Sequence, residues 1–177
     1  MNFYEKYILP PLIHLTCSTK PITYQRKKVV PMAKGTVLEI GIGTGLNLPF
    51  YNFEKINKVI GLEPSKQMHI KAKEAASRNN INLELIDLYA EDIPVEENSV
   101  DTIVITYTLC SINETETALK EFHRVLKSDG TLIFCEHGQS PDRNILNWQN
   151  RINPYLSLIH ISEPTRPLYI SYAVFCL

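Results

Sequence analysis

The sequence predicts an α/β domain built on an open, doubly wound parallel sheet. Short apolar runs of strand length alternate along the chain with segments whose apolar residues recur at helical spacing. Glycines at positions 41, 43 and 45 follow the first of these runs, as a tight turn after a buried parallel strand requires. Alternating strands and helices imply right-handed crossovers, with a ligand crevice at the carboxyl ends of the strands.

The individual elements follow from the same patterns. Strands are expected at residues 36–40, 58–62, 82–86, 102–107 and 131–136, and helices at residues 4–15 and 23–32. Ser65 can cap a further helix, whose apolar face consists of Met68, Ala72, Ala75 and Ala76. No internal repeat or low-complexity tract interrupts this order.

A last helix is expected before the fifth strand. Asn113 and Glu116 have the spacing of a capping box. The residues predicted to form its buried stripe are Leu119, Phe122, Val125 and Leu126.

The glycine segment after the first strand indicates a cofactor site. Its pattern is E-x-G-x-G-x-G from Glu39 to Gly45, whereas the dinucleotide pattern G-x-G-x-x-G would need a glycine where Leu46 stands. We expect the strand to turn directly into a helix, because helix N-termini offer unpaired amides to a carboxylate or phosphate. Bare backbone at the glycines would let a ligand approach closely.

This pattern resembles motif I of the Rossmann-like S-adenosylmethionine (SAM) methyltransferases. Glu63 ends the second strand 22 residues after Gly41, and residues 90–94, 99–104 and 118–134 resemble the later motifs of that family in the same order. The resemblance covers roughly residues 20–155. It implies a Rossmann-like doubly wound parallel sheet of the SAM methyltransferase type, with five strands present and the family's C-terminal antiparallel hairpin missing.

A narrower resemblance concerns the methyltransferase type 11 proteins of the UbiE-like and thiol-methyltransferase-like subgroup. It rests on residues 41–51 (GIGTGLNLPFY), 108–112 and 136–138, and on Trp148-Gln149. It implies methyl transfer from SAM to a small, apolar acceptor such as a thiol, a quinone precursor or a lipid headgroup. Two alternatives stay open: a non-catalytic SAM-binding or interaction protein, and a nicotinamide oxidoreductase, which Leu46 opposes.

The resemblance also implies which residues hold the cofactor. Glu63 would accept hydrogen bonds from both ribose hydroxyls. Many relatives carry Asp-Ala where this chain has Tyr89-Ala90, so Glu91, Asp92 or the backbone of Ala90 would read the adenine. The expected cofactor-binding residues are Glu39, Gly41, Gly43, Gly45, Asn47, Glu63, Pro64, Ala90, Glu91 and Thr106.

The acceptor pocket is expected after the fourth and fifth strands, at Tyr107, Thr108, Cys110 and Glu136. His137 could act as a general base near neutral pH, or it could hydrogen-bond a neighbouring loop. Cys110 is expected to be a small buried residue rather than a reactive thiol. No metal site is expected.

The chain divides into three parts. Residues 1–35 would form N-terminal helices on the substrate side, and residues 36–155 an incomplete SAM-binding domain. Residues 3–15 are interpreted as a lid, with peripheral membrane contact as a second possibility. Residues 156–166 (LSLIHISEPTR) match the translation of a transposon-end sequencing adaptor, and residues 170–177 (ISYAVFCL) match, in the same frame, that of the flow-cell primer that follows it. We therefore interpret residues 156–177 as an artefactual tail that makes few specific contacts.

The composition of the chain limits the kinds of partner that it is expected to bind. The chain has 18 basic and 19 acidic residues and a net charge of −1, which argues against nucleic acid. The basic cluster Arg26-Lys27-Lys28 is interpreted as a solvated helix face. Four cysteines without a C-x-x-C pair predict neither a disulfide framework nor a zinc site, and favour a cytoplasmic protein. The partner implied is a small-molecule acceptor.

Overall fold

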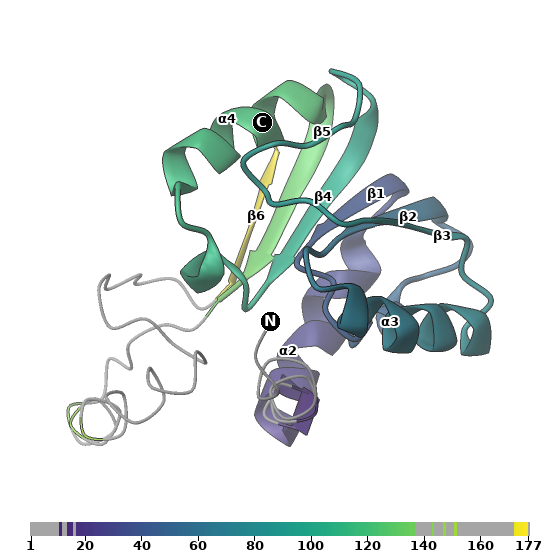
Figure 1. The fold of residues 1–177 in the computed structure, drawn as a ribbon, viewed down its shortest axis with the longest axis vertical. Helices are drawn as coiled ribbons and strands as arrows, with labels where there is room; N and C mark the ends of the chain where they lie inside the picture. Colours follow the sequence, from purple (N-terminus) through teal and green to yellow (C-terminus); the bar gives the residue numbers. More distant parts are fainter. Residues whose placement is uncertain are drawn as a thin grey trace.

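The computed structural model describes residues 17–136, single residues at 11, 14, 15, 143, 147 and 151, and the strand at 172–176. One six-stranded sheet organises these residues, in the strand order β3-β2-β1-β4-β5-β6 (Figure 1). The strands are β1 (Gly35–Ile40), β2 (Ile56–Leu62), β3 (Leu83–Ile86), β4 (Val100–Thr106), β5 (Leu126–Cys135) and β6 (Tyr172–Cys176). The first five strands are parallel to one another, which confirms the predicted doubly wound sheet.

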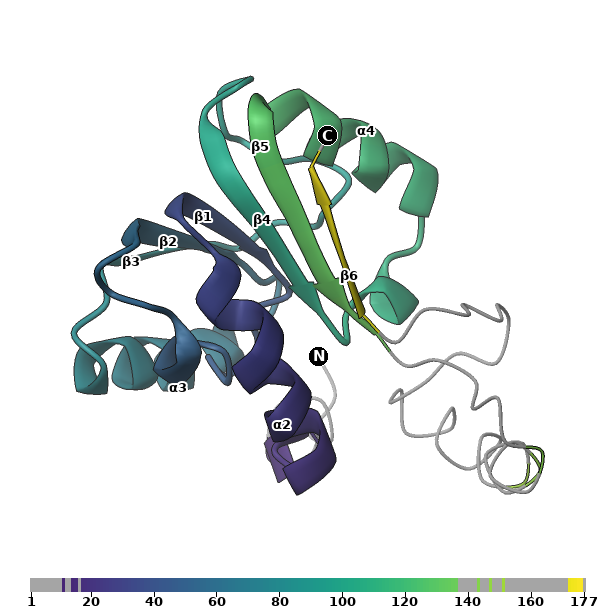
Figure 2. The same ribbon diagram turned by 180° about the vertical axis from the view of Figure 1, so that it is seen from behind.

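The helices cover both faces of this sheet (Figures 1 and 2). They are α2 (Lys20–Val29), α3 (Lys66–Arg78) and α4 (Thr115–Val125), with short 3₁₀ helices η2 (Val30–Met32), η3 (Leu48–Phe50) and η4 (Leu109–Ser111). The strand order reverses between β1 and β4, so the crevice outside their carboxyl ends is the topological switch point of the sheet.

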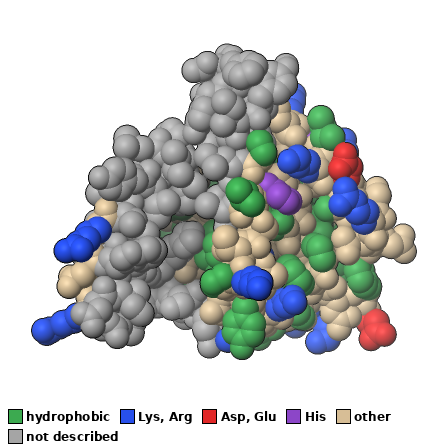
Figure 3. All heavy atoms as spheres, turned by 90° about the horizontal axis from the view of Figure 1, so that it is seen from below, with side chains coloured by type: hydrophobic (Ala, Val, Ile, Leu, Met, Phe, Trp, Pro, Cys, Tyr) green, Lys and Arg blue, Asp and Glu red, His purple; other side chains and the backbone are tan. Residues whose placement is uncertain are grey.

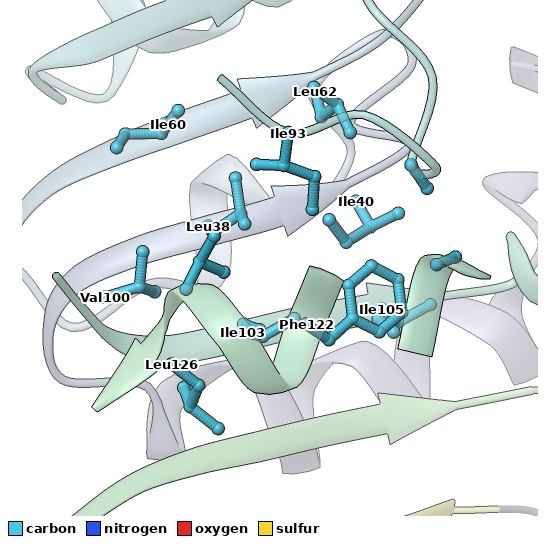
Figure 4. Packing of buried hydrophobic residues seen from close by; sticks show 13 residues of the cluster. Leu38, Ile40, Ile60, Leu62, Ile93, Val100, Ile103, Ile105, Phe122 and Leu126 are labelled. Atoms are coloured by element: carbon cyan, nitrogen blue, oxygen red, sulfur yellow. The ribbon is translucent and has the colours of Figure 1, made fainter. Parts of the chain in front are cut away.

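Alternation along the strands builds a separate core on each face. Leu38 and Ile40 of β1 pack with Ile103 and Ile105 of β4 and with Phe122 of α4 (Figure 4). The other face buries a second set, drawn from α2, η2, α3 and the strands: Val29, Val30, Val37, Val59, Ala76, Val104 and Ile133. Since both faces of β1 and β4 are buried, these strands are mainly apolar, as parallel strands usually are, with Glu39, Thr102 and Thr106 as buried polar exceptions.

The segment after β1 differs from the prediction. No α-helix follows the glycines, because residues 43–47 form turns and only the three-residue η3 comes before Tyr51. Gly41, Gly43 and Gly45 all have positive φ angles, so the chain does not enter a right-handed helix directly after β1. The expected helix N-terminus is therefore absent from this turn.

The caps of α3 and α4 also differ in detail. Ser65 is the N-cap residue of α3, but its hydroxyl donates to the side chain of Gln67 instead of accepting from the backbone. Helix α4 has Glu114 as its N-cap residue, so the predicted capping box at Asn113 is wrong. Leu119 is 47% exposed, and Ala118 occupies the buried position instead.

The tail was expected to make few specific contacts, and this expectation is wrong for residues 172–176. Strand β6 pairs antiparallel with β5 over five residues, from Thr131 opposite Cys176 to Cys135 opposite Tyr172. The outer side of β5 would otherwise present unpaired backbone groups, which an extended segment can satisfy. Among the described residues no helix is long and apolar enough to cross a membrane.

Candidate active site

A cavity of about 240 Å³ opens at the carboxyl ends of β1, β2 and β4, and we call it the first cavity. It lies where the strand order reverses, as expected for a doubly wound sheet. The residues expected from the sequence that line it are Gly41, Gly43, Glu63, Pro64, Ala90, Glu91, Thr106, Tyr107 and Thr108. The expected residues Glu39, Gly45, Asn47, Cys110 and Glu136 do not line it.

The three glycines after β1 have different tasks. A Cβ on Gly41 would lie 2.3 Å from Cγ2 of Thr108, and one on Gly45 would lie 2.7 Å from Cδ1 of Leu48. These two glycines are therefore required by packing. A Cβ on Gly43 would meet nothing closer than 3.9 Å, and Gly43 lines the first cavity. Bare backbone thus faces open space only at Gly43 among the three.

Glu63 stands at the end of β2, opposite this turn. Its Oε2 accepts a hydrogen bond from the Gly43 amide at 3.1 Å, and its Oε1 accepts one from the Ser65 amide at 2.9 Å. The residue is 9% exposed, and burial raises the pKa of its carboxyl group. Each oxygen keeps a second lone pair, so the carboxylate can still accept from two hydroxyl groups of a ligand.

The loop after β3 forms the opposite wall of the first cavity. Ala90 is buried, whereas Tyr89 is 63% exposed. Glu91 uses its Oε1 to accept from the Glu114 amide at 3.1 Å, and so ties this loop to the start of α4. Asp92, considered from the sequence for base recognition, does not line the cavity. The loop therefore offers a ligand mainly apolar surface and backbone, with Glu91 at its edge.

Glu39 and Asn47 lie behind the turn, in a buried polar network. Glu39 accepts from the Tyr51 hydroxyl at 2.7 Å and from Nδ2 of Asn47 at 2.9 Å. Nδ2 of Asn47 also donates to Oγ1 of Thr106, 2.9 Å away. Burial raises the pKa of Glu39 to about 7. These side chains join the turn to β1 and β4 rather than facing a ligand in the first cavity.

Arg26 completes this network, contrary to the prediction of a solvated helix face. It is 6% exposed, and its Nη1 donates to Oδ1 of Asn47 at 2.5 Å and to Oγ1 of Thr106 at 2.7 Å. Its guanidinium carbon lies 5.2 Å from the centroid of the Tyr107 ring. A signal was present in the sequence, since Arg26 shares a helix face with Val29 and Val30. The sequence patterns also did not identify Tyr51 as a member of this network.

The turn after β4 is held by Glu136. Its Oε1 accepts from the amides of Thr108 at 2.8 Å and Leu109 at 3.1 Å, and burial raises its pKa to about 7. Tyr107 begins this turn with a φ of 57°, a backbone conformation that residues other than glycine rarely adopt. Such conformations often mark functional sites. Burial raises the pKa of the Cys110 thiol, which favours the neutral form. His137 lies outside the described residues.

A second cavity of about 570 Å³ lies between α2 and α3 and shares Cys17, Arg26, Thr44 and Leu46 with the first. His14 contacts its rim through a hydrogen bond between its Nδ1 and Oγ1 of Thr44, 2.7 Å long. Figure 3 views the molecule from the end where α2 and α3 lie, and Lys and Arg side chains are spread over the described part of that face. Most of the predicted lid, residues 3–15, falls outside the described residues.

The described part of the chain contains no cluster of side chains that could hold a metal ion. No group of three or more His, Cys, Asp or Glu side chains comes together there. The arrangement at the first cavity is instead that of a small-molecule site: bare backbone at Gly43, a carboxylate at Glu63 and an apolar wall around Ala90.

Comparison with known proteins agrees with this geometry. Residues 38–134 match the model of a family described as a methyltransferase domain. A thiol S-methyltransferase of Rattus norvegicus is 34% identical over 123 residues, which cover 67% of this chain and 50% of the relative. A phosphatidylethanolamine N-methyltransferase of Cereibacter sphaeroides is 30% identical over 105 residues, covering 58% of this chain and 51% of the relative. The chain thus spans about half the length of these relatives.

Solved structures share the fold. A SAM-dependent methyltransferase from Aquifex aeolicus superposes with a TM-score of 0.63 at 23% identity, covering 85% of this chain and 87% of that chain. At that identity the likeness shows the arrangement of the sheet and helices and leaves the chemistry to the residues of the site.

Proposed function

This chain belongs to the methyltransferase domain family, and on that premise we propose that it transfers the methyl group of SAM to a small, apolar acceptor. The observation that carries the proposal is the open space in front of the Gly43 backbone. This backbone faces the first cavity with no atom within 3.9 Å of the place a Cβ would take, and its amide donates to Glu63. A bound nucleoside would fill that space and meet the Glu63 carboxylate beside it.

The residues of the first cavity divide the work of holding SAM. Gly41 and Gly43 would lie along the amino-acid part of the ligand, and Glu63 would accept from its ribose hydroxyls. The loop around Ala90 would cover the adenine. When bound, SAM supplies an electrophilic methyl group on a positively charged sulfur. The chain's own task is to align the acceptor with that methyl group and to exclude water.

The acceptor is proposed to be apolar because of the cavity wall. Leu46, Met68, Leu88 and Ile112 contribute apolar side chains to the first cavity. Such a wall suits the apolar parts of a thiol or a quinone precursor, and a lipid headgroup would enter with its amine neutral, because burying a charged amine is costly. The names of the two relatives above, a thiol and a lipid methyltransferase, support the same acceptor classes.

Calorimetry and methyl transfer test the proposal in two steps. Titration with SAM and with NADH separates a methyl donor site from a nicotinamide site, and we expect heat of binding only for SAM. Transfer from labelled SAM to a panel of thiols, phenols and lipids then separates an enzyme from a SAM-binding protein without activity. NADH binding without SAM binding would overturn the proposed cofactor. SAM binding without transfer to any acceptor would overturn catalysis.

A further inference from the structure

Arg26 is a buried cation whose hydrogen-bonding capacity is only partly used. It is 6% exposed, and both hydrogen bonds recorded for its guanidinium leave from Nη1. Nε is buried and has no hydrogen-bond partner among the described residues. Because a guanidinium stays protonated in proteins, the structure holds a positive charge and an unused donor at one buried place.

No carboxylate among the described residues forms an ion pair with Arg26. The ion pairs there join other residues, namely Lys58–Glu84, Lys66–Asp87, Arg78–Glu74, Arg124–Glu121 and Lys127–Asp101. The buried carboxyl of Glu39 accepts from Tyr51 and Asn47 instead. Burial raises the pKa of the carboxyl groups of Glu39 and Glu136, and the charge of Arg26 partly offsets this rise, but Arg26 forms no direct ion pair with either of them. Since a buried charge without a direct ion pair is costly, a ligand anion would complete this site.

The position of Arg26 suits that role. Its side chain lines both cavities, and Thr106 and Tyr107, its neighbours, also line the first. The anion-binding helix N-terminus that the sequence suggested after Gly45 is absent, since only the three-residue η3 follows. Arg26 therefore brings a positive charge to the turn where that helix would have done so. Basic side chains on the α2 and α3 face also favour the approach of an anion (Figure 3).

We propose that Arg26 binds the carboxylate of a ligand in the first cavity through the Nε side of its guanidinium. The planar fork of an arginine matches a carboxylate, which a lysine ammonium does not. The inference rests on the proposed function, which supplies one source of this group, the amino-acid end of SAM. A small thiol acceptor that also carries a carboxylate would be a second source. Arg26 precedes residues 38–134, the part matched by the family model.

The first experiment needs no variant. The parent chain is titrated with SAM and with decarboxylated SAM, which lacks only the carboxylate. If the carboxylate comes from the donor, we expect SAM to bind at least about 10-fold more tightly, as for the loss of a charge-assisted pair. If the parent binds neither compound, the proposed function itself fails and the inference falls with it.

Variants then connect the preference to this residue. Arg26→Gln should bring the affinities for SAM and decarboxylated SAM to within about 3-fold of each other, with the affinity for decarboxylated SAM nearly unchanged. Arg26→Lys, which keeps the charge near Asn47 and Thr106, should retain only part of the preference and covers the case in which the glutamine variant does not fold. The matched control is Lys27→Gln, an exposed neighbour on α2, which should leave the ratio as in the parent.

An acidic acceptor predicts a different result. The parent would then bind SAM and decarboxylated SAM equally, and in the presence of S-adenosylhomocysteine it would bind 3-mercaptopropionate at least about 10-fold more tightly than the neutral 3-mercaptopropionamide. Arg26→Gln or Arg26→Lys would remove or reduce that difference. The inference is overturned if the parent shows neither preference, or if folded Arg26 variants keep the parent's preference unchanged.

Discussion

The amide of Gly43 and the carboxylate of Glu63 are joined by a hydrogen bond of 3.1 Å between N and Oε2. This bond links the turn after β1 to the end of β2, the two parts of the proposed SAM site. Both residues line the first cavity, and their substitution should affect ligand binding in different degrees.

Gly43→Val should abolish SAM binding. The new side chain would enter the first cavity, and the φ of 54° adds strain on the order of 1–2 kcal/mol. Calorimetry measures the binding, and circular dichroism verifies that the variant is folded. Gly45→Ala is the contrasting variant: its Cβ would meet Leu48 at 2.7 Å, so the free energy of unfolding should fall by roughly 1–3 kcal/mol. Unchanged SAM affinity in folded Gly43→Val would contradict the site.

Glu63→Ala should weaken SAM binding by about 1–3 kcal/mol, because the charge-assisted hydrogen bonds to the ribose are lost. The effect is smaller than for Gly43→Val, since the cavity stays open. Calorimetry on Glu84→Ala provides the control. Glu84 is an exposed glutamate of β3 that pairs with Lys58 at 3.1 Å, and its removal should leave SAM affinity unchanged. Equal affinities for the parent and Glu63→Ala would remove Glu63 from the site.

The raised pKa of Glu136 predicts that the folded protein becomes less stable as the pH rises. Burial raises its pKa from 4.5 to about 7, so the folded protein binds this proton more tightly than the unfolded chain does. Its contribution is therefore fully present below about pH 4.5 and is lost as the pH rises to about 7, up to roughly 3 kcal/mol in total. Glu39 contributes with the same sign.

Glu136→Gln tests this pH dependence. The amides of Thr108 and Leu109 both donate to Oε1 of Glu136, so the amide oxygen of a glutamine can accept these two hydrogen bonds. Denaturant unfolding between about pH 5 and pH 8 should show a smaller loss of stability in the variant than in the parent. Glu84→Gln, on an exposed strand position, should retain the parent's slope. An identical slope in Glu136→Gln would mean that Glu136 does not titrate in this range.

His137→Asn tests the base predicted from the sequence. If His137 removes a proton, transfer to a protonated acceptor should slow on the order of 100-fold, while SAM affinity stays nearly unchanged. An acceptor that is already ionised should react at the parent's rate. A loss of the same size for both acceptors would indicate that His137 acts through the structure of its loop instead.

Local patterns were sufficient for the sheet and for the placement of the cavity. Apolar runs, glycines and the acidic residue at the end of β2 act through near neighbours, so their spacing predicts where parallel strands end. The same patterns failed after the glycines, where three positive φ angles stand in place of the expected helix start. The spacing of apolar residues identified Phe122, Val125 and Leu126 as buried but failed at Leu119, which is 47% exposed while Ala118 is buried.

The sequence by itself determined where the strands lie along the chain, the turn at Gly43 and the carboxylate at Glu63, because each depends on residues within a short stretch of chain. The order of the strands in the sheet, with β1 beside β4, depends on contacts between distant segments and came from the tertiary structure. Only the tertiary structure decided where the side chains of Glu39, Asn47 and Arg26 lie and what they contact. Arg26 and Thr106 are 80 positions apart and meet at 2.7 Å, and no spacing pattern encodes such a contact. Burial depends on everything that packs around a group. Glu39 and Asn47, expected as cofactor ligands, lie in a buried structural network, and Arg26, expected on the surface, is a buried candidate for binding an anion.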